Sequence, residues 1–224
     1  MVGLLVAAAG LVACSDVAPA GGASPTPTPT RSSSTPTAAP SSPSPKPSPT
    51  SKPTPSGVTT MTIPAIGVRG LRVVAYVGTA DDRPGTVIQN RGVAASPRGP
   101  RGGVGPGDVG NFIITGHRTS HGRPLGRATE LVNGDHILIT AGGTVYDYVV
   151  NRTMTISFRK PAELAQQNAA VPGRPGVTPT RAMITISTCA TPEDHAAGNF
   201  WHDELGNPEH RINKIGTLVA THPL

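Results

Sequence analysis

The residues of this chain best suited to chemistry are a thiol and an imidazole, each of which follows a strand-like run. Cys189 ends segment 182–189, whose alternating pattern places the cysteine on the opposite face from the two isoleucines of that run. His117 follows the apolar segment 111–115 and Gly116, which leaves room for a ligand beside the imidazole. A free thiol is only a few per cent ionised at neutral pH, so a cysteine nucleophile needs a nearby imidazole. The pair therefore predicts nucleophilic catalysis at a site that the fold must assemble.

A guanidinium is the third candidate. Arg211 lies before segment 215–221, the last expected strand, and its fork of N–H donors could hold the oxyanion that forms at an attacked carbonyl. Lys214 is a competing cation for the same role. Taken alone, each residue also fits a plain role. Cys189 could be a small buried hydrophobe, His117 a satisfied surface side chain and Arg211 a solvated charge.

The elements expected to position these residues are short β-strands, rich in β-branched residues and separated by turn signals. The candidate strands are 59–63, 70–77, 111–115, 135–140, 145–156, 182–188 and 215–221. Gly142 and Gly143 predict a two-residue hairpin, and Pro84 with Gly85 predicts a turn. The one expected helix is 161–168, which begins with proline. Many short strands with few helices predict an all-β barrel or sandwich.

Composition confines this folded part to the C-terminal region. The 224 residues include 25 Pro and 27 Gly but only 3% aromatics, which excludes one uniform globular domain. Residues 24–56 are almost entirely Pro, Ser and Thr, so we expect a disordered, extended spacer. The chain thus divides into an anchor segment 1–14, a linker 15–56 and a folded domain 57–224. The net charge of +6 is spread along the chain, which favours an anionic envelope over nucleic acid as its surroundings.

The N-terminal apolar run, residues 2–13, has the length of the hydrophobic region of a secretory signal. It ends in Leu-Val-Ala-Cys14, which resembles a bacterial lipobox and so implies acylation of Cys14. A plain membrane anchor with an incidental cysteine is the alternative. Both interpretations place the folded domain outside the cytoplasm, tethered to the membrane. The chain's two cysteines cannot form a disulfide framework.

Together, the three reactive fragments resemble the sortase family, the cysteine transpeptidases of Gram-positive cell surfaces. The fragments are Thr-Gly-His117-Arg, then Thr-Ile-Ser-Thr-Cys189, then the arginine before the final strand. Segment 62–68 is similar to the first strand of that fold. The run 105–111 with the segments 116–119 and 131–135 is similar to the class E type of actinobacteria. The resemblance covers residues 59–221.

The resemblance implies an eight-stranded β-barrel with one or two short helices and no cofactor. Cys189 would attack the Thr–Gly bond of a Leu-(Pro or Ala)-X-Thr-Gly sorting signal on a surface protein. His117 would act as general acid and base, and Arg211 would stabilise the oxyanion or position the substrate. An amine of a peptidoglycan precursor or cross-bridge would release the thioester. We further expect substrate contacts from Thr188, Arg118 and Trp201.

The segment 190–210, between the cysteine and the arginine, is longer than is typical of class E and is expected to form a lid or a substrate wall. Its histidines and carboxylates could bind zinc, but no His-Glu-x-x-His pattern appears, so we predict no metal site. His121 and Gly122 are similar to part of the L,D-transpeptidase motif, but Cys189 does not follow a Ser-His-Gly. The alternative to an enzyme is a non-catalytic surface lipoprotein whose barrel binds wall polymer or a protein partner.

Overall fold

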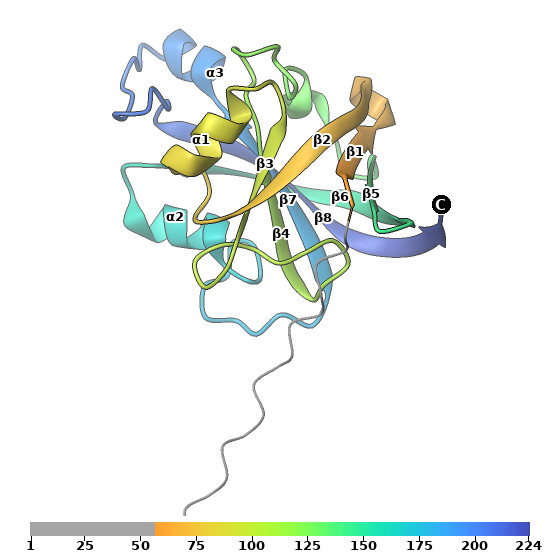
Figure 1. Cartoon of the computed structure of the whole chain (residues 1–224). Helices are drawn as coiled ribbons and strands as arrows, with labels where there is room; N and C mark the ends of the chain where they lie inside the picture. The colour runs from red at the N-terminus through yellow and green to blue at the C-terminus, as the bar shows by residue number, and fades with distance from the viewer. Residues whose placement is uncertain (1–56) are drawn as a thin grey trace, which may run out of the picture. The chain divides into compact units, whose positions relative to one another are not determined.

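The computed structural model describes residues 57–224, so the predicted anchor segment 1–14 and linker 15–56 lie outside the described residues. Within the described part, eight strands close into a barrel (Figure 1) in the order β1-β2-β3-β4-β7-β8-β6-β5, which confirms the predicted fold class. The strands are β1 (Thr59–Ile63), β2 (Val68–Val77), β3 (Ala94–Arg98), β4 (Gly110–Thr115), β5 (His136–Ala141), β6 (Thr144–Ser157), β7 (Ala182–Cys189) and β8 (His210–Pro223).

Three α-helices and two 3-10 turns connect these strands in residues 57–224. They are α1 (Arg83–Gln89), α2 (Pro161–Asn168), α3 (Thr191–Ala196), η1 (Pro64–Ile66) and η2 (Ala128–Glu130). Helix α2 has the predicted boundaries. The predicted hairpin joins β5 to β6, and both of its glycines adopt the positive φ that such a turn requires. None of the helices among these residues has the length and apolarity that a membrane span needs.

The prediction is wrong at α1, where Pro84 and Gly85 lie in the first helical turn instead of in a turn between strands. Asp82 caps the helix, because its carboxylate accepts a hydrogen bond from the Gly85 backbone N–H at 2.9 Å. Proline and aspartate are common both in turns and at helix starts, so the local pattern is ambiguous. Packing of α1 against β3 decides the outcome.

Three further elements differ from the expectation. Strand β3 was not predicted, because its Ala, Ser and Pro residues have little preference for strands. Helix α3 has six residues, which is too short to show a helical period. Strand β8 begins at His210 rather than at residue 215, so Arg211 lies inside the strand and not before it.

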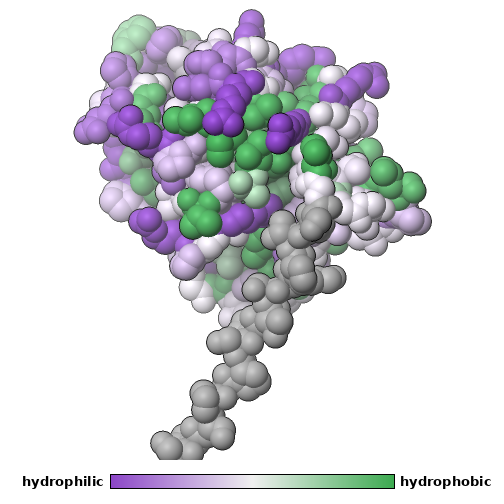
Figure 2. Space-filling model, in the orientation of Figure 1, coloured by the Kyte–Doolittle hydropathy of each residue, from purple (hydrophilic) through white to green (hydrophobic). Residues whose placement is uncertain are grey.

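Branched and aromatic side chains fill the barrel. Phe112 and Ile114 of β4, Ile184 and Ile186 of β7, and Ile137 of β5 are all fully buried in one cluster. The isoleucines of β7 therefore face the core. On the outer face shown in Figure 2, hydrophobic side chains gather near the centre, over α1 and the neighbouring part of β2, and hydrophilic side chains surround them. Because residues of β4, β5 and β7 pack in the same buried cluster, the core fixes the positions of these strands relative to one another.

Replacing Phe112 by Ala should lower the free energy of unfolding by about 3–5 kcal/mol, because it empties a closed part of the core. Urea denaturation followed by circular dichroism would measure the loss. The control is Val87→Ala on the exposed side of α1, which should change stability by no more than about 0.5 kcal/mol. Equal effects from the two substitutions would contradict this placement of the core.

Candidate active site

The pairing of three adjacent strands places the predicted reactive residues at one end of the barrel. Strands β4 and β7 are parallel, with Thr115 opposite Ser187, so both chains leave the sheet at the same edge. His117 and Cys189 each lie two residues beyond that pair. Strand β8 runs antiparallel to β7 and sets Arg211 directly opposite Cys189. The structure thus brings together three side chains that are up to 94 positions apart in the sequence.

His117 and Cys189 line one hollow of about 270 Å³, which lies between the end of α1 and the start of α3. Both helices are found at the upper left of Figure 1. The remaining lining residues come from α1, the loop after β4 and the segment before β8, namely Thr86, Asn90, Thr119, Ser120, His121, Thr191, Leu205, Gly206, Asn207 and Pro208. The site therefore offers a sulfur and an imidazole to one ligand.

Two contacts orient the imidazole of His117. Its Nε2 lies 2.7 Å from the side-chain oxygen of Asn90, at the end of α1. An amide oxygen can only accept, so Nε2 carries a hydrogen and Nδ1 is the nitrogen left for proton transfer. The ring also stacks on His121, with centroids 4.6 Å apart and planes inclined by 23°. Neither Asn90 nor His121 was identified from the sequence as a partner of His117.

Arg211 is almost completely buried, at 1% exposure, and most of its guanidinium is held by fixed partners. Nε donates to the Asp81 carboxylate at 3.2 Å, and Nη1 lies 3.3 Å from the carbonyl oxygens of Pro208 and His210. The ring of Phe158 lies 4.2 Å from the guanidinium carbon. Nη2 is buried and has no partner in the structure. Nη2 is therefore the one guanidinium nitrogen left without a partner, although Arg211 is not among the residues that line the Cys189–His117 hollow.

Asp81 is a further residue of the site that was not identified from the sequence. It is a buried carboxylate in a left-handed backbone conformation, with φ of 60°, in the turn between β2 and α1. Its second oxygen accepts from Gln89, whose amide also donates to the Thr115 hydroxyl at 3.0 Å. The chain Arg211–Asp81–Gln89–Thr115 thus connects β8, α1 and β4 beneath the site. The sequence pattern suggested only a turn in this region, and the neighbouring Asp82 caps α1.

The surroundings shift the pKa values of the thiol and the imidazole apart. Burial raises the pKa of Cys189; the positive charges of Arg211 and Arg118 oppose this shift, and the Asp81 carboxylate adds to it. Burial lowers the pKa of His117, and so do His121 and Arg211, whereas Asp81 acts in the opposite direction. The neutral thiol and neutral imidazole therefore dominate at neutral pH. The thiolate–imidazolium pair is a minor population.

Arg118 and Thr188 hold the backbone around the two reactive residues. Arg118 Nη1 donates to the carbonyl of Cys189 at 3.2 Å, and the same guanidinium forms an ion pair with Glu193 of α3. The hydroxyl of Thr188 is buried and donates to the carbonyl of Gly116 at 3.0 Å. Both side chains therefore support the reactive residues through the main chain, and neither lines the Cys189–His117 hollow.

The other two predicted candidates lie apart from this hollow. The ammonium of Lys214 binds the carbonyl of Leu131 at 2.7 Å and the hydroxyl of Thr153 at 3.0 Å, so its position does not compete with Arg211. Trp201 is 36% exposed and lines a neighbouring hollow that also contains Asp81 and Phe158. The guanidinium that lies over the Trp201 ring is that of Arg159, at 5.9 Å from the ring centroid.

Several histidines and carboxylates of the 190–210 segment are held by contacts within the protein. Asp194 accepts from the ring of His210 at 2.6 Å, Glu193 pairs with Arg118, and Asp203 accepts from the backbone of Asn207 at 2.8 Å. Within residues 57–224, no three His, Cys, Asp or Glu side chains gather in a group that could hold a metal ion. The segment forms α3 and an irregular loop beside the site.

Comparison with known proteins identifies the family. The sortase-domain family model matches residues 61–201. The chain is similar to the SrtA sortase from Actinomyces oris, at 18% identity over 78% of this chain and 89% of that chain, with a TM-score of 0.57. It is also similar to a structure of sortase E1 from Streptomyces coelicolor that holds a tripeptide in its active site. The identity is 21% over 75% of this chain and 90% of that chain, with a TM-score of 0.55. The chain is likewise similar to sortase E from Streptomyces avermitilis, at 21% identity over 74% of this chain and 89% of that chain, with a TM-score of 0.54.

The match of the family model over more than half of the chain shows that the chain belongs to the sortase family, whose members are cysteine transpeptidases. This confirms the family predicted from the sequence. The likeness to the solved sortases independently shows a shared fold. No curated protein matches the chain.

Replacing Asp81 by Asn should lower the pKa of Cys189, because it removes a negative charge that disfavours the thiolate. The pH at which alkylation by iodoacetamide reaches half of its maximal rate, here called the midpoint, would then be lower than in the wild type. The reaction should be followed on the peptide that contains Cys189, since Cys14 is also a thiol. The control is Asp82→Asn, which removes the neighbouring carboxylate charge but keeps an acceptor for the cap of α1, and it should leave the midpoint in place. An unchanged or higher midpoint in Asp81→Asn would contradict this account.

Proposed function

We propose that this chain cleaves a Leu-(Pro or Ala)-X-Thr-Gly sorting signal between Thr and Gly and transfers the surface protein to a cell-wall amine. The observation that carries the proposal is the convergence of Cys189, His117 and Arg211 at one end of three paired strands. The family model and the similar class E structures from Streptomyces support a class E-like assignment.

In the first half-reaction, the Cys189 thiolate attacks the carbonyl carbon of the threonine, and the carbonyl π electrons move to oxygen. The unpartnered Nη2 of Arg211 supports a role as donor to this oxyanion, because the rest of the guanidinium is already bound. The oxyanion then collapses and the C–N bond breaks. The imidazolium of His117 gives its proton to the departing glycine amine, and a thioester remains on Cys189.

In the second half-reaction, an acceptor amine attacks the thioester carbonyl and gives its proton to the neutral imidazole of His117. Collapse of this second tetrahedral intermediate breaks the C–S bond and releases Cys189 as thiolate. The thiolate–imidazolium pair is thereby restored. Arg118 and Thr188 act as positioning residues in this scheme, because each holds the main chain beside a reactive side chain. Trp201 forms a wall of the neighbouring hollow, along which the sorting signal extends.

The proposed location is outside the cytoplasm, at the membrane, facing the wall. The lipobox-like sequence at Cys14 and the apolar run before it support this location, and the Pro/Ser/Thr-rich segment supports a spacer between anchor and domain. More than one acyl chain on Cys14 would be needed for stable anchoring.

Replacing Cys189 by Ala should abolish cleavage of a fluorogenic Leu-Ala-X-Thr-Gly peptide, because the nucleophile is lost. Fluorescence release and mass spectrometry of the products would measure the loss. The matched control is Cys14→Ala, which removes the other thiol and should leave cleavage of a soluble peptide unchanged. Undiminished turnover by the Cys189 variant would overturn Cys189 as the nucleophile, whereas no turnover by the wild type would favour the passive surface barrel.

The rate profile should be a broad bell in pH, because activity requires a thiolate and an imidazolium together. Burial lowers the pKa of His117, which moves the acidic limb below the usual histidine value of about 6.5. Burial raises the pKa of Cys189, which moves the alkaline limb above the usual cysteine value of about 8.5. Between the limbs the rate is level, since loss of imidazolium offsets gain of thiolate. Measurement of kcat/KM against pH tests this, and limbs closer together than the two usual values would contradict it.

A further inference from the structure

Two buried polar side chains lie beside the nucleophile on the outer face of the sheet. Ser187 comes two residues before Cys189 on β7, so both side chains point to the same face, away from the core. On β8, Asn213 is opposite Ser187, just as Arg211 is opposite Cys189. The Ser187–Asn213 pair therefore lies next to the Cys189–Arg211 pair, about 7 Å away along the strands.

Within residues 57–224, neither side chain of this pair has a hydrogen-bond partner. Ser187 is 1% exposed and Asn213 is fully buried, yet the hydroxyl of the first and both amide atoms of the second are unpartnered. The same is true of both amide atoms of Gln167, of Oδ1 of Asn168 and of Nη2 of Arg211. Native structures leave few buried polar atoms unpaired, because burial removes their hydrogen bonds to water. Atoms of this kind therefore indicate a place where another molecule supplies the partners.

The end of helix α2 lies over this face of the sheet. Asn111 of β4 donates to the carbonyls of Gln167 and Ala169 at 3.0 Å, and the Thr185 hydroxyl of β7 donates to Asn111 at 2.8 Å. The end of α2 thus lies over the part of β7 that precedes Ser187. The unpartnered atoms of the helix and of the two strands gather between these elements. We call the five side chains that carry them the polar cluster.

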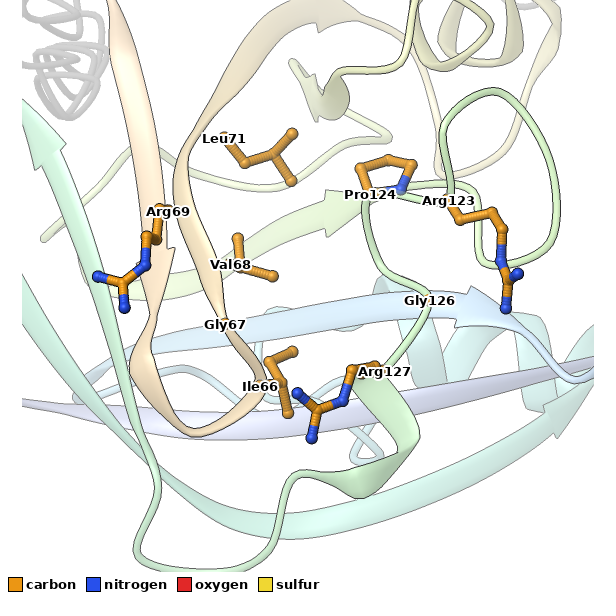
Figure 3. A pocket seen from close by; sticks show the side chains of 9 residues that line it. All are labelled: Ile66, Gly67, Val68, Arg69, Leu71, Arg123, Pro124, Gly126 and Arg127. Carbon is orange, nitrogen blue, oxygen red and sulfur yellow. The ribbon is translucent and has the colours of Figure 1, made fainter.

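A hollow elsewhere on the barrel shows the opposite case. It has a volume of about 310 Å³, lies between the start of β2 and the end of the loop that carries His117, and is lined in part by three arginines (Figure 3). Only Arg127 points into it, and Glu130 binds that guanidinium through Nε at 3.0 Å and through Nη2 at 2.6 Å. None of its lining residues carries a buried side-chain atom without a partner. The polar cluster is therefore the better candidate for a binding site.

A route from solvent reaches the polar cluster beside α2. The hollow lined by Trp201, with a volume of about 360 Å³, is also lined by Phe158 and by Leu164 and Asn168 of α2. Asn168 thus belongs both to this hollow and to the polar cluster. The Phe158 ring lies 4.2 Å from the guanidinium carbon of Arg211, so this ring separates the hollow from a second member of the cluster. Displacement of the ring and of α2, which has no side-chain cap at its start, would open the hollow onto the cluster.

We propose that Ser187 and Asn213 bind the main chain of the sorting signal, with Gln167 contacting it from α2. This inference rests on the proposed function and deepens it. A signal that runs along β7 from Cys189 places the residue two positions before its threonine over the Ser187–Asn213 pair, because an extended peptide rises by about 3.3 Å per residue. A hydroxyl and two amides supply both donors and acceptors, which the N–H and C=O groups of a peptide require.

The test replaces the pair by apolar side chains of similar size, in Ser187→Ala and Asn213→Leu, and measures cleavage of the fluorogenic sorting peptide by the full chain. Each variant should lower kcat/KM about three- to tenfold through a higher KM, with kcat and its pH dependence unchanged, because the lost contacts lie away from the scissile bond. Both variants should also raise the urea concentration at the midpoint of unfolding, because they remove buried polar atoms without breaking a hydrogen bond within the protein.

The matched control is Ser96→Ala. Ser96 is also fully buried, but its hydroxyl donates to the carbonyl of Ile113 at 2.6 Å. This variant should lower the urea midpoint and leave KM unchanged. An unchanged KM in Ser187→Ala and Asn213→Leu, or urea midpoints below that of the wild type, would overturn this inference alone and assign the polar cluster to structural water. Absence of any peptide cleavage by the wild type would overturn the proposed function and this inference with it.

Discussion

The site depends on one structural constraint, the parallel pairing of β4 with β7 beside the antiparallel β8. Parallel strands end at the same edge, so His117 and Cys189 leave the sheet together, and the antiparallel neighbour places Arg211 opposite the cysteine. A slip of one residue in either pairing would turn a reactive side chain to the other face of the sheet. The fully buried isoleucines of β7 oppose such a slip, because it would bring the polar side chains of Thr185 and Ser187 into the core in their place.

Electrostatic balance at the buried guanidinium is the second organising feature. An unpaired charge at 1% exposure would be costly, and the Asp81 carboxylate offsets much of that cost. The pair also tempers the effect of Arg211 on the thiol and the imidazole, because Asp81 shifts each pKa in the opposite direction from Arg211. The site therefore holds a neutral thiol and a neutral imidazole at rest while keeping one guanidinium donor free.

Helix α1 contributes more to the site than any other element outside the three strands. Its cap residue Asp82 directly follows Asp81, Gln89 binds that carboxylate, and Asn90 at its end binds His117. The sequence suggested only a turn here, because a seven-residue helix with Pro and Gly in its first turn has no clear helical period. The supporting contacts of the site were therefore missed together with the helix, whereas Cys189, His117 and Arg211 were identified from their positions next to strands.

The sequence by itself determined the class of fold and the family, and it predicted the three side chains that we propose for acyl transfer. Periodicity, turn residues and residue chemistry are local properties, so they can be read without knowing the fold. Only the tertiary structure decided that Arg211 and not Lys214 lies opposite Cys189, that Asp81 is its counterion, and that Thr188 and Arg118 bind backbone. Those outcomes depend on strand register and burial, which arise from contacts between residues far apart in the chain and leave no mark on the local pattern.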